Sequence, residues 1–130
     1  MNERALRRLF DSLNASLERL GEALSISDDQ PLAVDGTTQR FEFTFELFWK
    51  VLQRLLADQG IVANSPKSVL QHAYRLGWLD NEATWLKMLE DRNLTSHTYR
   101  EALALEIYAR IAGHHAAMRE ALQKLRAASS

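Results

Sequence analysis

Leucine recurs every three or four positions along the first part of the chain, and this spacing predicts an amphipathic helix. The stripe consists of Leu6, Leu9, Leu13, Leu17, Leu20 and Leu24. Asn2 is suited to cap this helix, because its short side chain accepts a hydrogen bond from a backbone N–H of the first turn. The following stretch, SISDDQPLAVDGTT, loses the periodicity and carries Ser, Asp, Pro and Gly, so it predicts a loop.

The segment RFEFTFELFWKVLQRLLADQG predicts a second helix with a wide apolar face. Its apolar positions are Phe41, Phe43, Phe45, Leu47, Phe48, Val51, Leu52 and Leu55. On a helical wheel they cover roughly 200° of the circumference, about twice what one contact with a bundle requires. We therefore expect either a central position or a second surface, such as a dimer interface. Asp35 or one of the next threonines is expected to cap this helix, and Gly60 to end it.

Two shorter helices are predicted next. Ser65 followed by Pro66 is typical of a helix start, and Gly77 closes this helix. Asp80 is expected to cap the following helix, NEATWLKMLEDRN. The side chains of that helix expected to face inward are Trp85, Leu86, Met88 and Leu89.

The last part of the chain predicts one long helix. Thr98 and Glu101 have the spacing of a capping box, in which each side chain satisfies a backbone N–H of the first turn. The stripe of this helix consists of Tyr99, Leu103, Ile107, Ile111, His114, Met118, Leu122 and Leu125. The whole pattern predicts an all-α, up-and-down bundle of three long helices and a shorter helical pair, in one domain over residues 1–130.

Composition narrows the class of protein further. A chain of 130 residues with 46% hydrophobic residues is long enough to bury a core without metal or disulfide staples. The absence of cysteine excludes disulfides, thiolate zinc sites and a cysteine nucleophile. The charged start MNERALRRLF does not resemble a signal peptide, and no apolar run has the length of a membrane span. We therefore expect a cytoplasmic protein without a membrane contact.

The net charge limits how the chain could bind nucleic acid. Sixteen Lys and Arg residues against seventeen Asp and Glu residues give a formal net charge of -1. A protein that coats itself with nucleic acid is usually more basic. Any contact with RNA is therefore expected to be local, or to be assembled by a dimer.

The segment DRNLTSHTY holds the densest set of chemically capable side chains in the sequence. A histidine transfers protons near neutral pH, and an arginine holds phosphate and balances the charge that develops on it. Arg92 and His97 together therefore suffice, in principle, for cleavage of RNA without a metal. Asn93, with Thr95 or Ser96, is suited to donate hydrogen bonds to phosphate oxygens.

Spacing leaves a structural alternative open for this segment. In one uninterrupted helix, residues five apart point about 140° away from each other, so Arg92 and His97 would not converge. A helix break near Thr98 or a site formed across a dimer would remove this difficulty. The alternative is that Arg92 pairs with Glu90 or Asp91 while His97 caps a helix end.

Other polar residues have simpler interpretations. His114 on the apolar stripe is expected to be a hydrogen-bonded core or interface histidine, and it points about 100° away from His115, which excludes joint metal chelation. Glu46 lies four positions before Lys50, which favours a solvated ion pair, although Glu46 also remains available to a partner. Trp49 is expected in the core or at an interface.

Three stretches carry a resemblance to a known family. They are RFEFTFELFWKVL, SPKSVLQHAYRLGWLD and DRNLTSHTY, which precedes the last helix. In this order they closely resemble the small HEPN proteins, and more narrowly the branch named nucleotidyltransferase substrate-binding proteins. The resemblance extends from about Leu6 to about Leu125. Its most specific part is an R-x4-H-x-Y motif, which Arg92, His97 and Tyr99 match; a second Arg–His pair, Arg110 and His115, lacks the tyrosine.

The resemblance implies a HEPN-like four-helix bundle with an extra short helix, which dimerises and brings two copies of the motif into one cleft. It implies a metal-independent endoribonuclease toxin without cofactors, with Arg92 and His97 catalytic and Asn93 supporting them. RNA would be its substrate.

The resemblance also implies a partner. A minimal nucleotidyltransferase would silence the toxin by binding it or by attaching AMP to Tyr99, and Ser96 and Asp91 are expected to share in modification or binding. Glu46, Phe43 and Trp49 are expected on the partner or dimer surface. The alternative that the same resemblance offers is a substrate-binding subunit of that transferase, with no catalysis of its own.

Overall fold

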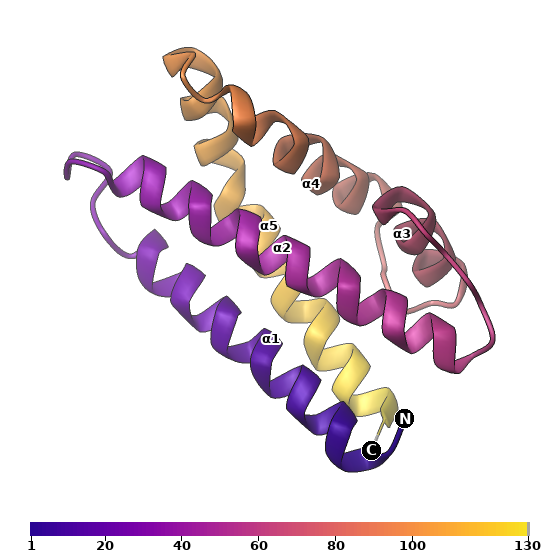
Figure 1. Ribbon diagram of the computed structural model, residues 1–130. Coiled ribbons are helices and arrows are strands. Elements are labelled where there is room, and N and C mark those ends of the chain that lie inside the picture. Colours follow the sequence, from indigo (N-terminus) through magenta and orange to yellow (C-terminus); the bar gives the residue numbers. More distant parts are fainter. Residues whose placement is uncertain (130) are drawn as a thin grey trace.

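The structure, a computed structural model, describes residues 1–129, in which all regular elements are helical (Figure 1). The α-helices are α1 (Glu3–Leu24), α2 (Ala33–Asp58), α3 (Pro66–Arg75), α4 (Glu82–Leu94) and α5 (Glu101–Ser129). A short 3-10 turn, η1 (Thr95–His97), connects α4 to α5. The predicted all-α bundle of three long helices and a shorter pair is confirmed. None of these helices is both long enough and apolar enough to cross a membrane.

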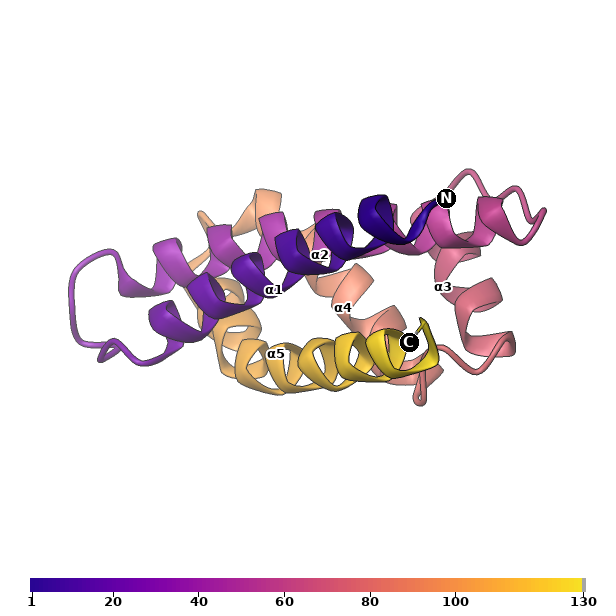
Figure 2. The same cartoon turned by 90° about the horizontal axis from the view of Figure 1, so that it is seen from below.

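Helix α2 lies at the centre of the bundle (Figures 1 and 2) and packs against all four other α-helices. Its residues Phe41, Phe45 and Phe48 are fully buried. The wide apolar face predicted for this segment therefore serves mainly its central position. Phe43 is the exception, because 64% of its surface remains exposed.

Several predicted helix ends are confirmed by local contacts. Asn2 accepts a hydrogen bond from the Ala5 backbone N–H at 2.8 Å, and the Ser65 hydroxyl accepts one from the Ser68 N–H at 3.2 Å. Gly60 and Gly77 have φ values of 79° and 78° just beyond α2 and α3. Only glycine adopts this left-handed backbone without strain, which explains why the helices end where the sequence indicated.

Two predicted caps are wrong by position. Helix α2 begins at Ala33, so Asp35 lies inside its first turn. A carboxylate there interacts favourably with the helix dipole, but it does not cap the helix. Asn81, and not Asp80, caps α4, because Asn81 has extended backbone and accepts a hydrogen bond from the Thr84 N–H at 3.1 Å. The Asp80 carboxylate instead pairs with a lysine of α5.

The predicted capping box at Thr98 is also wrong. Helix α5 begins only at Glu101, and Thr98 has φ -74° and ψ 1°, outside the extended region that a capping residue needs. Its hydroxyl donates to the Thr95 carbonyl at 3.0 Å. Tyr99 consequently precedes the helix, does not belong to its apolar stripe, and is 80% exposed.

Candidate functional site

The motif segment forms a tight turn between α4 and α5. The Thr95 hydroxyl donates to the Arg92 carbonyl at 2.7 Å, and the Arg100 backbone N–H donates to the His97 carbonyl at 3.2 Å. The first bond gives the Arg92 carbonyl, in the last turn of α4, a second partner beside the Thr95 backbone N–H, and the second bond closes the turn that follows η1. The helix is therefore interrupted between Arg92 and His97, and the 140° separation of a continuous helix no longer applies to them.

Arg92 is held by a carboxylate of the central helix. Its guanidinium donates to Glu46 of α2 and, at 3.0 Å, to the Asn93 side-chain oxygen. Lys50 lies 3.6 Å from the other Glu46 oxygen, which confirms the predicted Glu46–Lys50 pair. The alternative in which Arg92 pairs with Glu90 or Asp91 is wrong, because Glu46, remote in sequence, supplies its carboxylate partner.

The neighbours of Glu46 favour the ionised form of its carboxyl group. Burial alone would raise the pKa of its carboxyl group, but the neighbouring Trp49 indole, the Arg92 guanidinium and Lys50 together hold that pKa below its usual range. Trp49 itself is buried, with 9% of its surface exposed. Arg92 therefore faces a full negative charge, and any phosphate that binds Arg92 competes with or adds to this contact.

His97 and Tyr99 form a second, more open part of the site. Both side chains are exposed, and their rings meet edge to face with centroids 6.0 Å apart. Ser96 is exposed beside them. Within residues 1–129, Arg92 contacts Glu46 and Asn93, His97 contacts Tyr99, and no hydrogen bond or ion pair joins the two sets.

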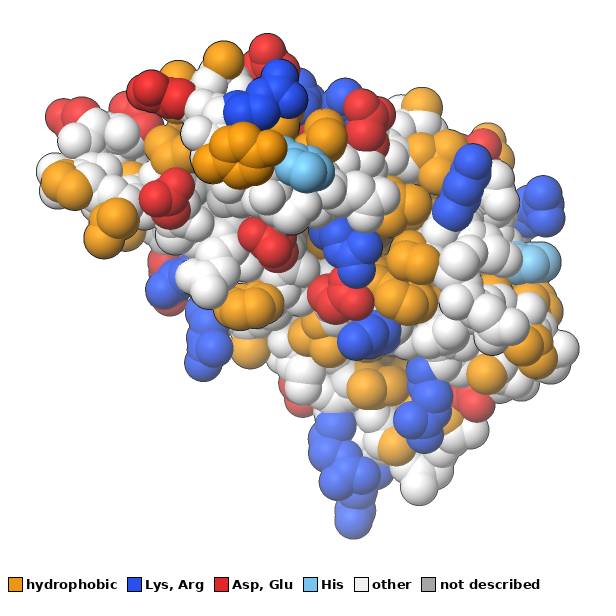
Figure 3. All heavy atoms as spheres, turned by 45° about the horizontal axis from the view of Figure 1, so that its top comes forward, with side chains coloured by type: hydrophobic (Ala, Val, Ile, Leu, Met, Phe, Trp, Pro, Cys, Tyr) orange, Lys and Arg blue, Asp and Glu red, His pale blue; other side chains and the backbone are white. Residues whose placement is uncertain are grey.

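The surface around this turn has no single charge character. On the face shown in Figure 3, acidic and basic side chains are interspersed with apolar ones. Phe43, 64% exposed on α2, adds an apolar side chain three positions before Glu46. In the described part of the chain, no group of three or more His, Asp or Glu residues is arranged to hold a metal ion.

A buried cluster of charged side chains, Asp91, Arg110 and His114, joins α4 to α5 beside this turn. Asp91 is fully buried, and its carboxylate accepts hydrogen bonds from Arg110 at 2.9 and 2.7 Å and lies 2.7 Å from Nε2 of His114. Burial opposes ionisation of Asp91, yet Arg110 and His114 outweigh it and keep its pKa below the usual range. Hydrogen bonding to Asp91 likewise raises the pKa of Arg110.

The sequence identified only part of this cluster. The interpretation of His114 as a hydrogen-bonded core histidine is confirmed, since it is 5% exposed and stacks on Phe41 with ring centroids 5.4 Å apart. The motif pattern offers for Arg110 only its spacing to His115. A usable signal was its position four residues before His114, which places both on one helix face. Asp91, expected among the binding residues, lies beneath the surface.

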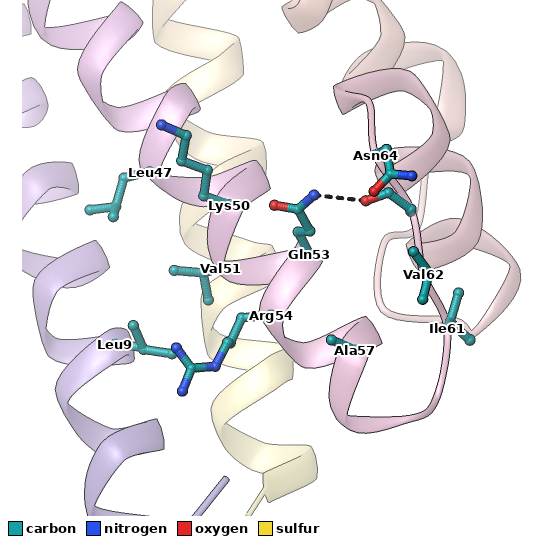
Figure 4. Close-up of a pocket in the computed structure, with 11 residues that line it drawn as sticks. Leu9, Leu47, Lys50, Val51, Gln53, Arg54, Ala57, Ile61, Val62 and Asn64 are labelled. Atoms are coloured by element: carbon teal, nitrogen blue, oxygen red, sulfur yellow. Dashed lines mark hydrogen bonds between the residues drawn. The ribbon is translucent and has the colours of Figure 1, made fainter.

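The main hollows of the surface lie away from His97 and Tyr99. A groove of about 440 Å³ runs between α1, α2 and the 61–64 loop, and Figure 4 shows that Lys50, Gln53 and Arg54 line it. A smaller hollow of about 330 Å³ between α3 and α4 includes Asn93 and Leu94. Asn93 and Leu94 are thus the residues of the motif segment that border this hollow.

Comparison with known proteins gives a consistent family assignment. A family described as nucleotidyltransferase substrate binding protein like matches residues 8–127. A Haemophilus influenzae protein named "Probable ribonuclease HepT" is 29% identical over 120 residues, which cover 85% of this chain and 82% of that protein.

Two solved structures have the same fold. A protein from Thermus thermophilus is 38% identical with a TM-score of 0.82, covering 88% of this chain and 98% of its own. A Haemophilus influenzae protein, described as having the fold of a substrate-binding domain of a nucleotidyltransferase, is 29% identical with a TM-score of 0.69. In that second comparison, 96% of this chain and 99% of the other are covered.

Proposed function

The chain belongs to the nucleotidyltransferase substrate-binding protein family, and on that premise we propose that it is a HEPN-type endoribonuclease toxin that a minimal nucleotidyltransferase neutralises. The name of the Haemophilus influenzae relative, "Probable ribonuclease HepT", supports the catalytic part of this proposal. The description of the second solved structure supports the choice of partner.

One observation carries the proposal. Helix α4 ends at Leu94, two residues after Arg92, and the chain then turns through η1 so that His97 and Tyr99 are exposed at the surface, while Glu46 of α2 fixes the Arg92 guanidinium. A proton-transferring ring and a fixed cation on the two sides of one turn are the groups that metal-free cleavage of RNA requires. Two copies of the chain, facing each other, would bring the Arg92 of one copy toward the His97 of the other.

The proposed reaction uses the ribose of the substrate as nucleophile. His97 takes the proton from the 2′-OH, and the 2′ oxygen forms a bond to the adjacent phosphorus. Arg92, with Asn93 beside it, balances the negative charge on the pentavalent phosphate. The bond from phosphorus to the 5′ oxygen then breaks, and that oxygen takes a proton from an imidazolium or from water. The products are a 2′,3′-cyclic phosphate and a free 5′-OH.

Tyr99 is the proposed point of control. Its phenol is 80% exposed and its ring contacts His97, so an AMP group attached to the hydroxyl would add bulk and a negative phosphate beside the histidine. Such a group would block the approach of RNA and would repel its backbone. Exposed Ser96 is adjacent to this position and is suited to contact the bound nucleotide.

The test of the catalytic part compares the purified chain with His97→Ala on labelled RNA in the presence of a chelator. We expect cleavage by the parent chain, products with a 2′,3′-cyclic phosphate, and a loss of at least about 100-fold in His97→Ala. His72→Ala, on α3, is the matched control and should retain the parent rate. Equal rates for the parent chain and His97→Ala would contradict the assignment.

The test of regulation uses mass spectrometry after incubation with the nucleotidyltransferase and ATP. A mass increase of one or more AMP units on Tyr99, absent in Tyr99→Phe, is the expected result. An unmodified Tyr99 together with full inhibition would leave complex formation as the route of neutralisation.

The second candidate function is a non-catalytic substrate-binding subunit of the transferase. The description of the Haemophilus influenzae structure as a substrate-binding domain favours it. This function predicts that the chain binds nucleotide or an acceptor near Tyr99 and increases the activity of the transferase, while the purified chain leaves RNA intact. Measurement of both activities on the same preparation separates the two functions.

A further inference from the structure

The buried cluster of Asp91, Arg110 and His114 joins the first residue of the motif segment, in the last turn of α4, to α5. The Asp91 carboxylate is fully buried and accepts two hydrogen bonds from the Arg110 guanidinium, one to each oxygen. The His114 ring contacts the same carboxylate and stacks on Phe41 of α2. A buried carboxylate is tolerated only when its partners are held in good geometry, so this cluster fixes the relative position of α4 and α5.

The Asp91–Arg110 pair joins the two ends of a stretch of chain that includes the motif segment. The chain passes from Asp91 through Arg92, turns in η1, and returns along α5 to Arg110, 19 positions later. The candidate residues of the site between these two ends are Arg92, Asn93, Ser96, His97 and Tyr99. The Asp91–Arg110 pair therefore holds together the two ends of the segment that carries them.

Asp91 and Arg92 also anchor the last turn of α4 in two directions. Neighbouring residues on a helix point about 100° apart. Asp91 accordingly contacts α5, while Arg92 contacts Glu46 on α2. A rotation of this turn that released Asp91 would also move the Arg92 guanidinium away from its present position.

We propose that the Asp91–Arg110–His114 cluster is a positioning device, in which Asp91 sets the orientation of Arg92 and its separation from His97 without touching RNA. This inference rests on the proposed ribonuclease function, because that function gives the position of the two side chains its importance. The positioning itself is measurable without any cleavage of RNA.

The experiment records NMR spectra of the labelled full chain, with Nε–Hε of Arg92 and the imidazole C–H groups of His97 as probes. Asp91→Asn keeps the shape of the side chain and removes its charge. We expect both probes to shift in this variant. In the cleavage assay we expect kcat to fall by about 10- to 100-fold, with KM changed by less than about twofold, because RNA binding groups remain.

A milder variant covers the case in which Asp91→Asn fails to fold. Arg110→Lys keeps the positive charge but replaces a two-point contact with one point. It is expected to shift the same probes in the same direction by a smaller amount. A cluster that sets the position of Arg92 must respond to both changes.

Two control variants separate positioning from general loss of stability. Leu125→Ala removes a buried side chain near the other end of α5, and Asp11→Asn breaks the exposed Arg126–Asp11 pair, whose nitrogen and oxygen lie 2.9 Å apart. Neither variant should move the two probes. If Asp91→Asn and Arg110→Lys lower the melting temperature yet leave both probes unmoved, as Leu125→Ala does, the inference is overturned.

The RNA cleavage assay and the NMR measurement test different claims. A parent chain that leaves RNA intact contradicts the proposed ribonuclease, whereas the NMR probes still decide whether Asp91 positions Arg92 and His97. Shifted probes combined with unchanged kcat in an active enzyme would contradict the inference and leave the proposed function standing.

Discussion

Glu46 is the residue whose effect on Arg92 is most directly testable. Its carboxylate forms an ion pair with the Arg92 guanidinium, which the proposed reaction needs for binding phosphate, and it adds a negative charge beside the site. We expect Glu46→Gln to tighten RNA binding several-fold at low salt, because one repulsive charge is removed. The loss of stability should be about 1 kcal/mol or less, since both side chains are about a third exposed.

The measurement for Glu46→Gln is RNA affinity at several salt concentrations, together with denaturant unfolding. Glu42→Gln, one turn earlier on the same helix, is the matched control and should change affinity less. Weaker RNA binding by Glu46→Gln would mean that Glu46 is needed to hold Arg92 for the substrate, and would reverse the expected sign.

Asp91 predicts how stability depends on acid. Its pKa in the folded chain lies below the ordinary value of 3.8, so the folded state favours the charged carboxylate. Its contribution to the free energy of unfolding is therefore fully present above that ordinary value and is lost as pH falls toward the lowered pKa. Acid titration followed by circular dichroism should show a smaller acid-dependent loss in Asp91→Asn than in the parent chain.

At the scale of elements, the sequence predicted helix ends where a single residue decides them. The left-handed backbone at Gly60 and Gly77, and the Ser65–Pro66 start, follow from the chemistry of those residues. The predicted capping box at Thr98 is wrong because the Thr98 hydroxyl donates back to the Thr95 carbonyl of η1 and does not accept from the first turn of α5. Such competition among neighbouring bonds cannot be read from spacing.

Two glycines predict opposite outcomes for the same substitution. Gly113 lies in α5 with nothing within 4 Å of an added Cβ, so Gly113→Ala should raise the free energy of unfolding by about 0.5–1 kcal/mol. Gly77 has φ +78° at the end of α3, so Gly77→Ala should lower it by about 1 kcal/mol or more. Denaturant unfolding of both variants measures the difference, and equal signs would contradict the assigned backbone conformations.

At the scale of the whole molecule, periodicity was sufficient for the all-α class and for the buried faces of the long helices. It was not sufficient for the site. Arg92 pairs with Glu46 across 46 positions of sequence, and Asp91 pairs with Arg110 across 19, so both contacts depend on how the helices pack. The motif residues could be chosen from the sequence, whereas their partners could not. The single domain over residues 1–130 and the dimer stay predictions.

The proposed dimer gives the last prediction. Phe43 is 64% exposed on α2, close to Glu46, and an aromatic side chain of this size is a natural anchor for a second copy. We expect Phe43→Glu to raise the dissociation constant of the dimer at least about tenfold, because a charge would have to be buried at the contact. Analytical ultracentrifugation over a concentration series measures this constant.

Val62→Glu is the matched control for this experiment. Val62 is 80% exposed, but it lines the groove between α1, α2 and the 61–64 loop, away from the motif segment. A dimer that brings two motif copies together through the Phe43 face should tolerate a charge at Val62. If Val62→Glu dissociates the dimer and Phe43→Glu does not, the copies meet through the groove, and each Arg92 must then act with the His97 of its own chain.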